Sequence, residues 1–158
     1  MNLEYFTVKL APKVSLGIPL EDMGSVIQLE KTNICTVPGV PSFWYGVANF
    51  KGSLLWILDS QSFFNLEFSQ RSSQKLTAVI LQNQQSKNQN RVALVTQQLQ
   101  GIISVESSRI KTSTDNISWS RLKASCSGIA QSEAQEIYLI NPLALLQQLH
   151  QQSSLVSA

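Results

Sequence analysis

The stretch Val37-Pro-Gly-Val-Pro-Ser-Phe-Trp-Tyr-Gly-Val-Ala-Asn-Phe-Lys-Gly-Ser-Leu-Leu-Trp-Ile-Leu-Asp59 decides how this sequence folds. Its prolines on either side of Gly39 fix an extended backbone that cannot complete a ladder of hydrogen bonds. Gly46 and Gly52 then bound a short segment, and such glycines often adopt a φ that other residues avoid or admit another backbone closely. The apolar residues before Asp59 predict a strand buried on both faces, with Trp56 in the core. The order therefore predicts a proline-rich turn, a hairpin and a buried strand.

Further short strands are predicted wherever β-branched and aromatic residues alternate with polar ones. With the apolar strand above, we expect them over Tyr5–Leu10, Ser15–Leu20, Leu54–Leu58, Leu76–Leu81, Arg91–Val95, Ile102–Glu106 and Glu136–Ile140. The polar segment Gln82–Asn90 is expected to be the mobile tip of an antiparallel pair. No repeat or linker divides the chain. Short strands, turn residues and one final helix favour β-barrels over a parallel α/β sheet.

The final helix is predicted from Pro142 to about Gln151, because Asn141 is a good N-cap and proline is favoured at the first helical position. Residues 152–158 are expected to form a flexible tail. The predicted apolar stripe is Leu143, Leu146 and Leu149 with Leu145 beside it, and the polar face is Gln147, Gln148 and Gln151. A short helical turn is expected after Asp59, and a loop with at most one helical turn over Thr112–Trp119.

Composition excludes several classes of function. The chain has 158 residues, 43% of them hydrophobic, which is enough for one core or two small cores side by side. Only 14% are charged, the net charge is +2, and no basic run is present, so neither a nucleic-acid footprint nor a polybasic membrane patch is predicted. No apolar run approaches the roughly 18 residues of a transmembrane helix, and the first residues lack the features of a secretory signal. We therefore expect a cytoplasmic protein.

No catalytic, cofactor or metal site is predicted. Cys35 and Cys126 lie far apart without metal-type neighbours, so in a reducing compartment we expect two buried free thiols. His150 is the only histidine and lies near the end of the predicted helix. The chain has no His/Cys cluster, no phosphate-binding loop before a helix and no Ser-His-Asp set. A non-catalytic protein is expected.

The segment from Val37 to Asp59 resembles the CheW family of signalling adaptors. Members of that family carry a Val-Pro turn, a Gly-Val-Ile-Asn-Leu-Arg-Gly hairpin and an apolar strand that ends in Asp. Further likeness lies in Leu16-Gly-Ile-Pro-Leu20 with Met23 and Val26, in Leu94-Val95 leading to Gly101-Ile102, and in Tyr138–Leu146. The resemblance implies a mainly β fold: one domain over residues 1–158, built from two intertwined SH3-like five-stranded barrel subdomains with short helices and a C-terminal helix.

The resemblance also implies a function. It implies a non-catalytic adaptor that couples methyl-accepting chemoreceptors to the regulatory domain of a CheA-like histidine kinase, at receptor arrays on the inner face of the membrane and without membrane insertion. By position, the receptor-facing residues are Met23, Ser25, Gly46 and Lys51, while Val37, Pro38 and Asn49 shape the hairpin. Residues that contact the kinase are not predicted.

Three positions depart from the family pattern. Lys51 stands where the family usually has Arg, which keeps the charge but loses the planar two-pronged donor. Gln97 and Asn141 stand where the family has Asp, so their hydrogen-bonding roles survive without the charge. These changes indicate a divergent adaptor.

Other interpretations remain open at this stage. Consecutive Phe43, Trp44 and Tyr45 either anchor a partner or fold over a barrel mouth. Trp44 and Tyr45 would also suit a barrel that stacks the bases of single-stranded nucleic acid, although the basic groove this needs is not evident. A small hydrolase would have to use Asp59 or Glu21 with partners that the sequence does not reveal.

Overall fold

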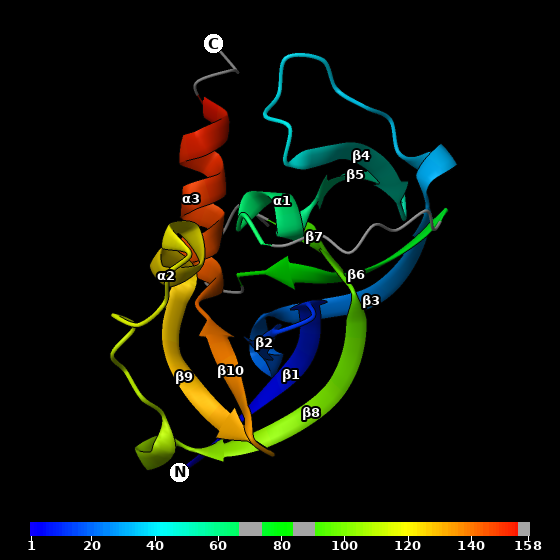
Figure 1. Ribbon diagram of the computed structural model, residues 1–158. Helices are drawn as coiled ribbons and strands as arrows, with labels where there is room; N and C mark the ends of the chain where they lie inside the picture. Colours follow the sequence, from blue (N-terminus) through cyan, green and yellow to red (C-terminus); the bar gives the residue numbers. More distant parts are fainter. Residues whose placement is uncertain (67–73, 84–90, 155–158) are drawn as a thin grey trace.

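The computed structural model describes residues 1–66, 74–83 and 91–154, and Figure 1 shows their arrangement. In chain order the elements are β1 (Asn2–Ala11), β2 (Val14–Pro19), η1 (Leu20–Asp22), β3 (Met23–Glu30), η2 (Lys31–Asn33), β4 (Trp44–Phe50), β5 (Ser53–Leu58), α1 (Ser60–Phe63), β6 (Lys75–Gln82), β7 (Arg91–Thr96), β8 (Gln98–Glu106), η3 (Ser107–Arg109), α2 (Ser120–Ser125), β9 (Cys126–Ser132), β10 (Gln135–Ile140) and α3 (Pro142–Ser154), where η marks a 3-10 turn.

The described strands form two five-stranded sheets. One has the order β3-β6-β7-β5-β4 and is called barrel 1, and the other has the order β8-β1-β2-β10-β9 and is called barrel 2. Each contains one parallel pair, β5 with β7 and β10 with β2, among antiparallel neighbours. Each sheet also encloses a small apolar core of its own. The predicted fold class, mainly β with two five-stranded barrel subdomains, is confirmed.

The two barrels are built by strand exchange between the halves of the chain. The first half, β1 to β5, and the second half, β6 to β10, follow the same plan of a hairpin, a long strand, a 3-10 turn and a second hairpin. The β1–β2 hairpin pairs with β8 and β10, whereas the β6–β7 hairpin pairs with β3 and β5. Each half therefore completes the barrel of the other.

A third and larger core lies between the barrels. Barrel 1 contributes buried residues such as Leu58 and Leu94, and barrel 2 contributes residues such as Leu16. Phe63 of α1 is buried there with its ring centroid 4.9 Å from that of Phe43. Burial of apolar surface at crystal-like density resists sliding of the two barrels. The barrels therefore form one body.

Three strands and one helix were not predicted as such. β3 and β9 lie at the outer edges of their sheets, and β3 leaves most of its residues exposed or half-buried, so the apolar alternation is weak. β4 begins at Trp44, within the aromatic stretch for which the sequence analysis left both partner contact and packing on the barrel open. α2 follows the predicted Thr112–Trp119 loop directly and buries only Leu122 and Ser125. Too few apolar residues mark these elements for a periodic pattern to emerge.

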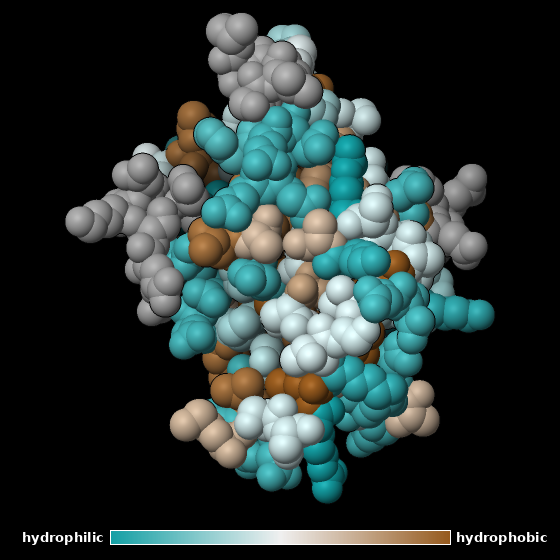
Figure 2. Space-filling model, turned by 90° about the vertical axis from the view of Figure 1, so that its left-hand side faces the viewer, coloured by the Kyte–Doolittle hydropathy of each residue, from teal (hydrophilic) through white to brown (hydrophobic). Residues whose placement is uncertain are grey.

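α3 differs in part from its prediction. It runs to Ser154, and its buried leucines are Leu145 and Leu149, whereas Leu143 is 45% exposed. Gln148 is half-buried rather than on a solvent face, because its amide donates to the Arg121 carbonyl and the Ser125 hydroxyl. The face of the molecule on the α3 side is mostly hydrophilic, with apolar side chains in small separate groups (Figure 2). The buried face of α3 is therefore shifted by about one residue from the predicted stripe of Leu143, Leu146 and Leu149.

Some predictions fall outside the described residues. Most of the expected mobile tip, residues 84–90, and the last part of the expected tail, residues 155–158, belong to segments that the structure does not describe. Residues 152–154 continue the final helix.

The cysteines are both free, as predicted, but they are not both buried. Cys35 is exposed and Cys126 is half-buried. Cys35 lies in a loop that lines the outer edge of β4, where little covers it. Burial raises the pKa of the Cys126 thiol to about 12, which keeps it protonated and poorly nucleophilic at neutral pH.

Asp59 gives a prediction for the pH dependence of stability. Its carboxylate caps α1 by accepting from the Ser62 N–H at 3.2 Å, as Asn141 caps α3 through the Ala144 N–H at 3.2 Å. Burial raises the pKa of Asp59 above its ordinary value of 3.8, against the lowering effects of its backbone hydrogen bonds and of Lys31. The folded state therefore binds this proton more tightly than the unfolded state, so the contribution of Asp59 to stability falls as pH rises through the raised pKa.

Asp59→Asn keeps a capping oxygen and removes this titration. We expect the free energy of unfolding of the variant, relative to the wild type, to increase between about pH 4 and pH 7. Urea unfolding across that range measures it. Asp59→Ser, which also keeps a capping oxygen without a titrating carboxyl, is the matched variant and should show the same rise. Parallel stability curves for Asp59→Asn and the wild type would contradict the assignment.

Candidate partner-binding surface

The hairpin of β4 and β5 turns at Lys51 and Gly52, which lie between the paired residues Phe50 and Ser53. Both turn residues have positive φ, 51° and 82°, as the two-residue turns that match strand twist require. The Asn49 side-chain oxygen accepts from the Gly52 N–H at 3.0 Å. Asn49 therefore fixes the turn that presents Lys51 to solvent.

Two cations flank one aromatic ring at this turn. The Lys51 Nζ lies 5.2 Å from the centroid of the Phe50 ring, and the Arg91 Cζ lies 5.6 Å from the same centroid. In the part of the chain that the structure describes, neither cation forms an ion pair. The residues Phe50, Lys51 and Arg91 are called the tip cluster below. The cluster combines two positive charges with an aromatic ring.

Arg91 was missed by the sequence analysis. It begins β7 and reaches the hairpin only because β7 pairs with β5 in barrel 1. No local sequence motif marks Arg91, so it could have been found only from the pairing of β7 with β5. Its guanidinium approaches the same Phe50 ring as the Lys51 ammonium, so a planar donor lies near the ring where the family's Arg is replaced by Lys51.

Gly46 lets the preceding loop close onto the hairpin. The Cys35 N–H donates to the Val47 carbonyl at 2.8 Å, and the Val47 N–H donates to the Cys35 carbonyl at 2.9 Å. Gly46 has φ of +139°, and a Cβ there would lie 2.1 Å from the Cys35 carbonyl oxygen. Half-buried Val37 and exposed Pro38 follow this bridge directly and therefore lie beside the hairpin. Only glycine permits this contact.

The outer face of β5 is apolar but only partly covered. Leu58 is buried between the barrels, Trp56 is half-buried, and Leu54 at the hairpin end is 72% exposed. The predictions of a strand buried on both faces and of Trp56 in the core were therefore wrong. The core between the barrels reaches only the Leu58 end of the strand, so the other end is left to solvent.

The three consecutive aromatic residues fold onto the protein. Phe43 is buried, and Trp44 and Tyr45 are half-buried. The ring centroid of Trp44 lies 5.2 Å from that of Trp56 in an edge-on arrangement. Of the two outcomes that the sequence left open, packing against the barrel is the one observed.

Met23 and Ser25 are not part of the β4–β5 hairpin. Both belong to β3, which is the opposite outer strand in the order of barrel 1. Ser25 is exposed, whereas Met23 is half-buried and packs against the core between the barrels. The structure thus gathers five of the seven predicted contact residues, Val37, Pro38, Gly46, Asn49 and Lys51, around one hairpin and places two on another strand.

Metal-ligating side chains do not gather in the residues that the structure describes. They contain no group of three or more His, Cys, Asp or Glu residues placed to hold a metal ion. His150 is exposed on α3. None of the described helices has the length and apolarity needed to cross a membrane.

Two interlocked five-stranded barrels joined by a common core define the class of fold to which this chain belongs. The model of the CheW-like domain matches residues 4–150, and the chain belongs to this family. Its members are non-catalytic scaffold and adaptor proteins of chemotactic signal transduction. The resemblance noted in the sequence is therefore confirmed.

A solved structure of the family has the same fold. The chain is similar to the scaffolding protein TtCheW from Thermoanaerobacter tengcongensis, with a TM-score of 0.75 and 18% identity over 89% of this chain and 90% of that one. No curated protein sequence matches the chain.

Gly46→Ala tests the loop closure. The added methyl group would overlap the Cys35 carbonyl at a φ that alanine rarely adopts, so we expect a loss of about 3 kcal/mol in the free energy of unfolding. Gly52→Ala is the matched control, because its φ is +82° but no atom lies within 4 Å of the added Cβ. The control should lose only about 1 kcal/mol. Urea unfolding compares the two variants, and equal losses would show that the bridge to Cys35 imposes no constraint.

Proposed function

We propose that this chain is a cytoplasmic, non-catalytic adaptor that couples chemoreceptors of the methyl-accepting type to a CheA-like histidine kinase. Membership of the CheW-like family supports the adaptor class. The observation that carries the proposal is the tip cluster, which lies at the turn of the hairpin where the resemblance to the family is most specific and adds Arg91 from β7.

The receptor-facing surface is proposed to centre on this hairpin. Lys51 and Arg91 would pair with carboxylates of the receptor tip, and Arg91 would supply the bidentate geometry that Lys51 lacks. Asn49 and Gly46 hold the turn and the loop in place, while Val37 and Pro38 extend the surface along the edge of β4.

Met23 and Ser25 have a different proposed role. Ser25 is exposed on β3 next to Val26, which is 39% exposed, so this strand offers a second contact area on barrel 1. Met23 would support this strand indirectly, because its half-buried side chain packs against the core between the barrels.

Signal transfer through such an adaptor needs no reaction. The large core between the barrels joins them into one body, so a partner bound to either barrel is held in a fixed relation to a partner on the other. Receptor state would then change the populations of array conformations through differential contacts. The nucleic-acid alternative gains no support, because the half-buried rings of Trp44 and Tyr45 pack against the barrel.

Charge reversal at the tip cluster tests the receptor surface. We expect Lys51→Glu and Arg91→Glu each to weaken binding to a soluble receptor fragment by about tenfold, because an attractive pair becomes a repulsive one. Binding to the kinase regulatory domain should be unchanged. Lys13→Glu, at an exposed lysine of the β1–β2 turn, is the matched control.

Titration calorimetry with each purified partner gives both affinities. If both reversals bind the receptor fragment as the wild type does, the tip cluster lies outside the interface. If the wild type binds neither partner, the adaptor function itself is wrong.

A further inference from the structure

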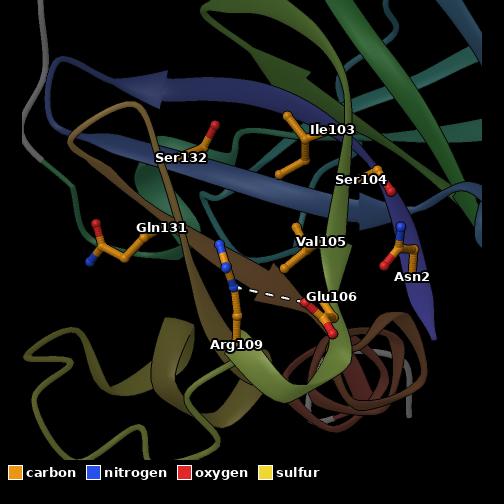
Figure 3. Close-up of a pocket in the computed structure, with 8 residues that line it drawn as sticks. All are labelled: Asn2, Ile103, Ser104, Val105, Glu106, Arg109, Gln131 and Ser132. Carbon is orange, nitrogen blue, oxygen red and sulfur yellow. Dashed lines mark ion pairs between the residues drawn. The ribbon is translucent and has the colours of Figure 1, made fainter.

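We draw no further inference here: the strongest candidate, the groove between the outer strands β8 and β9 of barrel 2 into which the Arg109 side chain extends (Figure 3), carries nothing, because the Arg109 Nε already lies 3.9 Å from the Glu106 carboxylate and nothing in the described residues shows what covers the two strand edges.

Discussion

The exchange of hairpins between the two halves of the chain is the constraint on which the rest of the structure depends. β1 and β2 have partners only in the barrel of the second half, and β6 and β7 only in that of the first. Neither half can therefore satisfy its own strand edges, and both must fold together. The exchange also brings the outer faces of the barrels into contact, where the largest core forms around Leu16, Leu58 and Leu94. A rigid relation between the two barrels follows from connectivity rather than from any single contact.

The duplicated plan lets each barrel be compared with the other. A glycine at 46 and one at 128 both admit a crossing loop, through the Cys35–Val47 and Lys111–Ile129 bridges. Features needed for folding therefore recur in both halves. The exposed turns do not recur: Lys51-Gly52 is basic, whereas Glu133-Ala134, also at positive φ, is acidic. Chemical difference at equivalent exposed positions is where partner choice can be encoded without cost to the fold.

The sequence alone predicted much of this fold, and its failures have a common cause. Strands whose alternation reflects a covered face, such as β6 and β7, were found, whereas β3 was missed because an outer strand leaves many residues exposed. The hairpin at Lys51 was predicted because turn chemistry is local. Arg91 and the exposure of Leu54 were not, since both depend on which strands pair and where the core ends. The internal duplication was also invisible, because its two copies share geometry rather than residues.

The two barrels also differ around Glu30 and Glu106, which end β3 and β8. Equivalent carboxylates close the long strands of both barrels, yet only Glu106 has a cation from its own turn. An ion pair at an exposed site contributes little to stability, so the loss of the arginine equivalent at Asn33 would cost the fold almost nothing. It would, however, change where the neighbouring cation comes from, because Glu30 has Lys75 of the paired strand β6 opposite it, whereas Glu106 has Asn2 of β1 opposite it. Two barrels of one plan thus offer unlike surfaces at opposite ends of a rigid body. A scaffold of this kind can hold different partners in a fixed order, because neither surface can substitute for the other.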